Sequence, residues 1–360
     1  MAAADASTTA VVSAAESLTG TTLQGLWRVT ARKKIGKGGT GQTTSCCYEG
    51  LGPDGHAVFI KAFDIKAMLL EDDTEGVRRV LNEFQHEVEA LKYCAERKLS
   101  RVTRFLAKGV VPVDGEPINY LVTEYAPQGS VREHLVPGDE SICSVKRLYM
   151  LRDVAASLAQ LHGVNIAHQD VKPSNAVCWP DGRVKLTDLG SSSRAGIPEA
   201  PPHDGDFIAG QDCYAPYELL YRDVRAWNAR RLGCDLFLLG GLVFTTFTGI
   251  PLTLHVIQNL DESLRPANFG KEYREVLPDI LDSHRQIVGD FMTELAPPLI
   301  RDELIQTINC LCHPDPAKRG HPKNVLSSRS QFSLEQYISA FNRMARTLEV
   351  NVHRRRAYGQ

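Results

Sequence analysis

The chain has 360 residues, 43% of them hydrophobic, and its 41 lysines and arginines nearly balance its 43 acidic residues. This size allows a substantial core in one large two-lobed domain or two ordinary ones, and the balanced charge gives no overall field that would favour nucleic acid as a partner. The longest apolar run, 236–250, is too short to span a bilayer, so it predicts a buried helix and no membrane insertion. Nine cysteines without a CxxC pair, and an N-terminus without a basic signal region, predict reduced thiols in a cytoplasmic protein.

The first third of the chain has the pattern of a small β-rich domain, which we expect over 25–125. Residues 1–24 are rich in Ala, Ser and Thr without a sustained period, which predicts a flexible leader. Apolar residues near helical spacing predict one helix at about 75–97. β-like segments bounded by turn residues predict strands over 26–36, 57–64, 104–111 and 119–125.

The rest of the chain has a mainly helical pattern and predicts a larger domain over 126–330. The Pro-rich segment 195–207 predicts a loop. Residues 331–360 are expected to form a last helix and a basic tail. The helix would cover 333–350, and its apolar face favours packing on the larger domain over the docking of a partner. The basic run 354–356 is interpreted as a solvated end.

A glycine-rich segment, GKGGTG, places Gly36, Gly38 and Gly41 at GxGxxG spacing. Such a cluster can be a plain turn, and the same spacing occurs in dinucleotide-binding folds. Those folds need a helix directly after the glycines, whereas residues 42–50 are β-branched and end in a turn. We therefore expect a hairpin between two strands, whose backbone N–H groups can cover phosphates.

Lys61 lies inside an apolar strand, where an unpaired ammonium group would be costly to bury. One interpretation is a lysine at the edge of the strand that extends its charge to water. The alternative comes from Glu87 on the predicted helix, which can pair with Lys61 and leave its ammonium able to hold a polyphosphate.

The segment IAHQDVKPSNAVCW gathers Asp170, Lys172 and Asn175 between apolar flanks, and Asp188 follows after a turn at 180–182. Two short strands joined at this turn would bring Asn175 and Asp188 close together. Amide and carboxylate oxygens suit Mg²⁺, which uses few protein ligands in addition to substrate phosphates. Asp170 stays outside that pair and can orient and deprotonate an attacking hydroxyl, while Lys172 can neutralise charge on the transferred group.

These motifs stand in the order typical of the eukaryotic-type (Hanks-type) serine/threonine protein kinase family, which the chain resembles from about Trp27 to Arg319. GKGGTG resembles the glycine-rich loop, VFIK the VAIK strand, HQDVKPSN the catalytic loop and DLG the DFG motif. The resemblance implies an α+β, bilobal fold with a small β-rich N-lobe that carries helix αC and a larger, mainly helical C-lobe. It also implies ATP and Mg²⁺ as cofactors.

The resemblance assigns a role to individual side chains. It implies that the catalytic residues are Asp170 as the base, Lys172, Lys61 and Glu87. It implies that the metal ligands are Asn175 and Asp188. It further implies a nucleotide site lined by Gly36, Lys37, Gly38, Gly39, Gly41, Phe59, Lys61, Thr123, Glu124, Ala126 and Val177.

Two structural supports also follow from the resemblance. Glu218 is expected to pair with Arg319, and Asp235 is expected to hold the backbone of the catalytic loop. This set belongs to protein kinases, so it disfavours a small-molecule phosphotransferase of related fold.

The chain departs from the family pattern at several positions. Phe59 stands where the family has a small alanine above adenine, and Thr43 stands where it has a valine. Gln169 replaces the arginine before the catalytic aspartate, and Gln211 replaces a threonine of the activation segment. Because that arginine is commonly balanced by a phosphate on the activation loop, its absence predicts control without such a phosphate, through αC, the tails or a regulatory partner.

The leading functional interpretation is an ATP-dependent serine/threonine kinase that transfers the γ-phosphoryl group to hydroxyls of a protein substrate. The KPSN context of Lys172 favours Ser/Thr as acceptor, by resemblance. A nucleotide-binding pseudokinase scaffold is the second interpretation, motivated by Phe59 and Gln211. A small-molecule phosphotransferase is the third.

Overall fold

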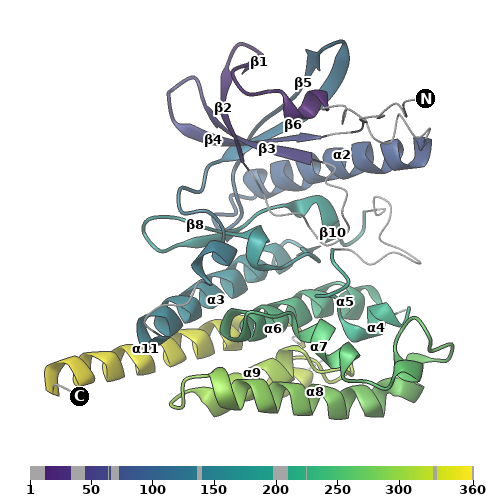
Figure 1. Cartoon of the computed structure of the whole chain (residues 1–360), viewed down its shortest axis with the longest axis vertical. Coiled ribbons are helices and arrows are strands. Elements are labelled where there is room, and N and C mark those ends of the chain that lie inside the picture. Colours follow the sequence, from purple (N-terminus) through teal and green to yellow (C-terminus); the bar gives the residue numbers. More distant parts are fainter. Residues whose placement is uncertain are drawn as a thin grey trace, which may run out of the picture. The chain divides into compact units, whose positions relative to one another are not determined.

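The computed structural model describes residues 13–33, 45–63, 65, 73–135, 140–197, 210–223, 225–326 and 331–358 (Figure 1). The chain divides into two compact units, of which unit 1 comprises Met1–Val88 with Arg104–Tyr125 and unit 2 comprises Glu89–Thr103 with Ala126–Gln360. Unit 1 is built on a β-sheet and unit 2 is mainly helical. The α+β, bilobal architecture expected from the sequence is confirmed.

Unit 1 contains an antiparallel sheet of six strands in the order β1-β2-β3-β4-β6-β5. Burial alternates along β4, so one face of the sheet is apolar and covered. Asp114 and Gly115 both have positive φ and form the two-residue connection between β5 and β6, as a tight hairpin requires. The strands are β1 (Thr22–Leu23), β2 (Trp27–Lys33), β3 (Ser45–Leu51), β4 (Ala57–Phe63), β5 (Phe105–Val113) and β6 (Glu116–Glu124).

The helix expected at about 75–97 is α2 (Thr74–Glu96). It begins after Asp73, whose carboxylate accepts the N–H of Gly76 at 2.7 Å and so caps the first turn. Its buried side chains recur at helical spacing, and the ring of Phe84 contacts the edge of Phe63 on β4 with 4.9 Å between the ring centroids.

The expectation of a flexible leader over 1–24 is wrong for residues 13–24, while 1–12 lie outside the described residues. The segment forms a 3-10 turn, η1 (Ala14–Glu16), and strand β1, and it buries Leu18 completely in the core of unit 1. The hydroxyl of Tyr48 donates to the carbonyl of Ala15 at 2.5 Å. The small side chains that give this segment its low-complexity composition let its backbone approach the sheet closely.

Residues 89–103 also depart from the expected boundary, because they belong to unit 2 rather than to a domain over 25–125. Backbone bonds explain this assignment. The N–H of Leu186 donates to the carbonyl of Arg101 at 3.1 Å, and the N–H of Thr103 donates to the carbonyl of Leu186 at 2.9 Å.

Unit 2 is organised around α6 (Leu232–Thr248), which packs against α3, α8 and α9. The window 227–248 is long and apolar enough to cross a membrane, but 89% of its most apolar part is buried inside the protein. The predicted buried helix is therefore confirmed as a core helix. The other helices are α3 (Glu140–His162), α4 (Tyr217–Leu220), α5 (Trp227–Arg230), α7 (Leu252–Gln258), α8 (Tyr273–Leu295), α9 (Arg301–Leu311), α10 (Pro322–Val325) and α11 (Glu335–Tyr358).

The last helix, α11, lies along α3 (Figure 1), so the expected packing on the larger domain is confirmed. It buries Phe341, Met344 and Ala345 completely. It continues to Tyr358 instead of ending at Val350, so the basic run 354–356 belongs to the helix and not to an irregular tail. No Gly or Pro interrupts this stretch, so nothing in it ends the helix earlier.

Two short pairs of strands in unit 2 bring distant segments together. β8 (Ala176–Cys178) pairs with β9 (Val184–Leu186), and β7 (Ile166–Ala167) pairs with β10 (Ser193–Arg194). These pairs fix the irregular segments 168–175 and 187–192, which contain one-turn 3-10 helices. The 3-10 helices of unit 2 are η2 (Val131–His134), η3 (Pro173–Asn175), η4 (Leu189–Ser191) and η5 (Glu262–Leu264).

Replacing Leu18 by Ala tests whether residues 13–24 belong to the folded unit. Because Leu18 is fully buried, the substitution should lower the free energy of unfolding by about 2–5 kcal/mol, as measured by denaturant titration. The neighbouring exposed Thr19 provides the control, since Thr19→Ala should stay within about 0.5 kcal/mol of the wild type. Equal stabilities of the two variants would show that the segment is not part of the core.

Candidate active site

In unit 1, Lys61 on β4 and Glu87 on α2 form an ion pair with 2.9 Å between Nζ and Oε2. Their side chains are only 17% and 4% exposed, so the interpretation of Lys61 as a solvated edge lysine is wrong. The flanking residues Ile60 and Ala62 face the opposite side of the strand and are buried in the core. The predicted pairing is confirmed, and it is the kind of pairing that a nearly buried ammonium group requires.

Phe59 lies on the same face of the sheet as Lys61, because the two residues are two positions apart on β4. Its partner across the sheet is Thr123 on β6, and Thr123 is buried. The expected nucleotide residues Phe59, Lys61 and Thr123 therefore share one face. The expected glycine-rich residues Gly36, Lys37, Gly38, Gly39 and Gly41, and the departure at Thr43, lie outside the described residues.

The segment after β6 carries backbone groups that suit a hydrogen-bonding ligand. The N–H of Glu124 donates to the carbonyl of Arg104 at 3.0 Å, and the carbonyl of Ala126 accepts from Gly129 at 3.2 Å. The N–H of Ala126 has no acceptor among the residues that the structure describes. Since backbone donors in folded proteins are nearly always satisfied, this N–H is suited to a bound acceptor or water.

In unit 2, the buried carboxylate of Asp235 holds the loop 168–175, which the sequence motifs predict to be the catalytic loop. Its Oδ2 accepts the N–H of His168 at 2.8 Å, and its Oδ1 accepts the N–H of Gln169 at 2.7 Å. The ring Nε2 of His162 lies 2.8 Å from the same Oδ2. Hydrogen bonds to an ionised group in the interior are strong, so the expected role of Asp235 in fixing this backbone is confirmed.

Asp170 is buried at the end of this loop, and two side chains converge on its Oδ2. Lys172 Nζ and Asn175 Nδ2 both donate to that oxygen at 2.8 Å. Burial raises the pKa of the Asp170 carboxyl above its ordinary value; the ammonium of Lys172 opposes this shift and the charge of Asp188 adds to it. The result is a carboxylate of fixed orientation that is more basic than an exposed aspartate.

The hairpin β8–β9 brings the neighbourhoods of Asn175 and Asp188 together, as predicted. Ala176 pairs with Leu186, and the N–H of Thr187 donates to the carbonyl of Asn175 at 3.0 Å. Asp188 adopts a left-handed conformation with φ 64°, which is uncommon for a residue with a side chain and is often found at functional sites.

The expected metal ligands have the right chemistry for Mg²⁺. The amide nitrogen of Asn175 donates to Asp170, and its amide oxygen, which accepts from the Ser174 hydroxyl at 3.3 Å, has a second lone pair for a cation. Asp188 adds a carboxylate. Among the described residues, no group of three or more His, Cys, Asp and Glu side chains could hold a metal ion. A pair of oxygen ligands fits Mg²⁺ because this ion completes its shell with waters and phosphate oxygens.

Asp153 on α3 is a positioning residue that sequence reasoning missed. Its side chain is 1% exposed, accepts the N–H of Val184 at 3.1 Å and pairs with Arg152 at 2.8 Å. It therefore fastens the start of β9 to α3. An aspartate in a helical pattern usually faces solvent, so the only signal in the sequence is the apolar residues on either side of the Arg152–Asp153 pair.

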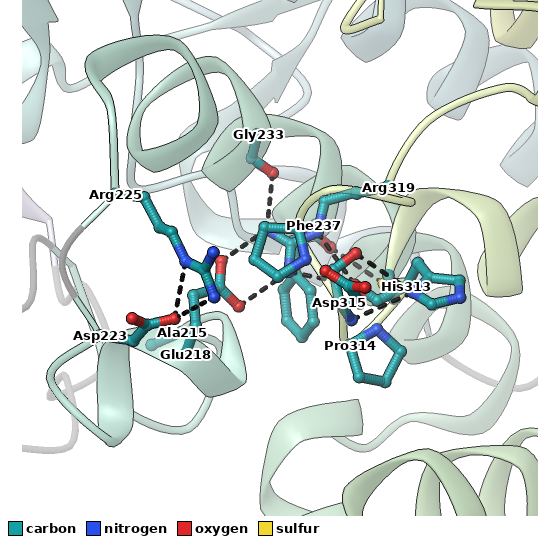
Figure 2. A network of polar contacts seen from close by, with 12 residues as sticks. Ala215, Glu218, Asp223, Arg225, Gly233, Phe237, His313, Pro314, Asp315 and Arg319 are labelled. Atoms are coloured by element: carbon teal, nitrogen blue, oxygen red, sulfur yellow. Dashed lines mark hydrogen bonds and ion pairs between the residues drawn. The ribbon is translucent and has the colours of Figure 1, made fainter. Parts of the chain in front are cut away.

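Glu218 and Arg319 form a bidentate pair in the interior, as Figure 2 shows. Both oxygen–nitrogen distances are 2.7 Å, and the side chains are 2% and 0% exposed. The guanidinium also donates to the carbonyls of His313 and Gly233 and lies over the ring of Phe237. The predicted pairing is confirmed, and nearly every donor of the arginine is satisfied.

A second buried polar contact involves Tyr217, the residue before Glu218. The hydroxyl of Tyr217 donates to Nδ1 of His284 at 3.0 Å, and Nε2 of His284 donates to Oδ1 of Asn309 at 3.1 Å. Burial lowers the pKa of His284 to about 3, so the ring is neutral at physiological pH. Sequence reasoning missed this contact because the three residues lie on different helices.

The geometry agrees with a comparison of the whole chain. A family model for the protein kinase domain matches residues 29–329. The chain belongs to this family. As a protein kinase domain it contains the ion pair of unit 1 and the fixed catalytic loop of unit 2 where the family motifs predict them.

Several curated proteins are similar to this kinase domain. A probable receptor-like protein kinase of Arabidopsis thaliana is 31% identical over 52% of the chain and 28% of its own length. A probable serine/threonine-protein kinase of Dictyostelium discoideum is 31% identical over 46% of the chain and 29% of its own length. An inactive serine/threonine-protein kinase of Mus musculus is 30% identical over 37% of the chain and 21% of its own length. The matches thus cover less than a third of each of these relatives.

Removing the positive partner of the buried pair should be strongly destabilising. Arg319→Met leaves the carboxylate of Glu218 buried without its partner, and we expect a loss of about 3–5 kcal/mol in the free energy of unfolding, measured by denaturant titration. The pair Arg225–Asp223 in Figure 2 provides the control, because both of its side chains are partly exposed. Arg225→Met should cost about 1 kcal/mol or less. Similar losses in both variants would contradict the assigned importance of the buried pair.

His284 should make the stability of the protein depend on pH. The unfolded state protonates this histidine below the ordinary histidine pKa of 6.5, whereas the folded state keeps it neutral down to about 3. Stability is therefore lost as the pH falls through this window, by about 1.4 kcal/mol per pH unit from this one group. We expect the free energy of unfolding, measured by denaturant titration at several pH values in this window, to depend less steeply on pH for His284→Gln. The control is His353→Gln, at an exposed position, which should keep the slope of the wild type. Identical slopes would exclude a neutral buried His284.

Proposed function

We propose that this protein kinase domain is catalytically active and transfers the γ-phosphoryl group of ATP to serine or threonine hydroxyls of a protein substrate. The observation that carries the proposal is the convergence of Lys172 and Asn175 on one oxygen of the buried Asp170 carboxylate. The loop that presents this carboxylate is fixed by Asp235. Such an arrangement is prepared for chemistry before any substrate binds.

Each unit contains groups whose chemistry suits a part of the nucleotide. Lys61, kept in place by Glu87, would donate to phosphate oxygens, and the N–H of Ala126 would donate to adenine. Phe59 would border the adenine on the face that it shares with Lys61. Asn175 and Asp188 would hold Mg²⁺, which would neutralise phosphate charge.

In the proposed reaction Asp170 orients the acceptor hydroxyl and takes its proton on a carboxylate oxygen. Its raised pKa makes it a better acceptor than an exposed aspartate. Lys172, which already contacts Asp170, would stabilise negative charge on the transferred group. Phosphoryl transfer depends mostly on such positioning and charge stabilisation.

Other observations support the class of acceptor hydroxyl and the cellular compartment. The KPSN context of Lys172 and the serine/threonine kinases among the relatives support Ser/Thr acceptors. All nine cysteines are free thiols, which supports a reducing compartment such as the cytoplasm. The substrate would be a protein, and a regulatory partner is part of the same proposal.

A second candidate function is a scaffold that binds nucleotide without turnover. Phe59, Gln211 and the inactive kinase of Mus musculus among the relatives favour it. A small-molecule phosphotransferase is less well supported, because the pair Glu218–Arg319 and the loop anchor Asp235 belong to protein kinases.

Separate substitutions of the two aspartates test the proposal. Asp170→Asn should retain nucleotide binding but lower turnover by about 10²–10⁴-fold, because it removes only the base. Asp188→Asn should mainly weaken Mg²⁺-dependent nucleotide binding. Transfer from labelled ATP to a generic protein substrate and titration of nucleotide affinity measure the two effects. Asp181→Asn, in the exposed β8–β9 turn, is the control and should match the wild type.

The results also discriminate between the candidates. Near-normal transfer by Asp170→Asn, with Lys61→Ala inactive, would contradict the assignment of the base. A wild type that binds Mg²⁺-ATP and transfers nothing would favour the scaffold.

A further inference from the structure

The side chain of Gln169 forms a bridge between two segments of unit 2. Its Nε2 donates to the carbonyl of Ser191 at 2.8 Å, and its Oε1 accepts from Nη1 of Arg231 at 2.6 Å. Gln169 is 2% exposed, so its side-chain amide is buried. Its backbone adopts the left-handed conformation with φ 64°, which is uncommon for a residue with a side chain. The bridge links the catalytic loop to the segment that follows Asp188.

The N-cap residue and the first turn of α6 hold Gln169 at its side chain and its backbone. Asp235 accepts the backbone N–H of Gln169, and Arg231, four residues earlier, donates to its amide oxygen. Arg231 is only 3% exposed. Burying a guanidinium is costly, so its bond to Gln169 is a specific contact rather than a chance one at the surface.

The position of Arg231 explains why an amide can stand at residue 169. An arginine there would place a second guanidinium at bonding distance from Arg231, and like charges in a buried site repel strongly. Gln169 avoids this repulsion, because its oxygen accepts from Arg231 while its nitrogen donates to the carbonyl of Ser191.

The segment after Asp188 is also held by other contacts within unit 2. Arg194 on β10 stacks on Tyr93 with 3.6 Å from the guanidinium carbon to the ring centroid, and the N–H of Ala195 donates to the carbonyl of Asn165 at 3.0 Å. Ser192 and Ser193 are each 1% exposed, and the hydroxyl of Ser192 donates to the carbonyl of Leu189 at 2.7 Å.

We propose that Gln169 and Arg231 are positioning residues that hold the segment 189–194, and with it Asp188, in the conformation required for phosphoryl transfer. This inference rests on the proposed function, because it names residues that position the same site. The bridge carries the effect of Arg231 to the carbonyl of Ser191, three residues after Asp188.

Gln169→Glu separates positioning from folding. A carboxylate keeps the contact with Arg231 and adds charge to it, but it cannot donate to the carbonyl of Ser191. We expect an unchanged or higher melting temperature, a kcat lowered about tenfold or more with little change in the KM for ATP, and faster hydrogen exchange in the peptide 189–197. Gln306→Glu, at an exposed position of α9, makes the same chemical change and should alter none of these quantities.

A charge exchange provides the second test. Gln169→Arg should lower kcat about tenfold or more because it brings two guanidinium groups together, and Arg231→Gln should lower it because it removes the donor. The double variant Gln169→Arg/Arg231→Gln restores one guanidinium and one amide and should recover kcat to within about threefold of the wild type. All proteins are treated with phosphatase, and their phosphorylation is checked by mass spectrometry.

Two results would overturn the inference. These are unchanged kcat and hydrogen exchange in Gln169→Glu, or strictly additive effects in the double variant. A wild type without any transfer would overturn the proposed function instead. In that case the hydrogen exchange of Gln169→Glu against the wild type still decides whether the bridge holds the segment.

Discussion

The buried carboxylate of Asp235 is the interaction on which the site of unit 2 depends. Its two oxygens accept the backbone N–H groups of His168 and Gln169, so the first turn of the core helix α6 fixes the loop that follows β7. Asp170 is the next residue, and the side chains that orient it come from the same loop. Because α6 is buried on almost every side, the packing of the helical core fixes the position of this loop.

The elements that could be predicted from the sequence have either a long apolar period or a charge in apolar surroundings. The helix expected at about 75–97 is α2 because its buried side chains recur regularly. Lys61 stands in an apolar strand, where a charge needs a partner, and the predicted helix offered Glu87. The pairing of Glu218 with Arg319 was implied by the resemblance to the kinase family. The nucleotide residues of the glycine-rich loop stay predictions, since they lie outside the described part of the chain.

Other features escaped prediction because their signal is not local. Residues 13–24 have the composition of a disordered leader, and only the apolar face of the sheet gives Leu18 a place to pack. Asp153 and Arg231 lie in helical segments, where charged residues normally face water, and their partners are distant in the sequence. A sequence pattern shows that a polar residue is present but not which backbone group it will meet.

The segment that contains η1 and β1 packs on the sheet of unit 1, and this packing determines where the folded domain begins. The similarity to the family starts at residue 29, whereas η1 and β1 lie before it. A chain cut at that boundary would leave the hydroxyl of Tyr48 without the carbonyl of Ala15 and would open the apolar surface around Tyr120 to water. Exposed apolar sheet surface promotes self-association, so the shortened domain would aggregate although every family motif is intact.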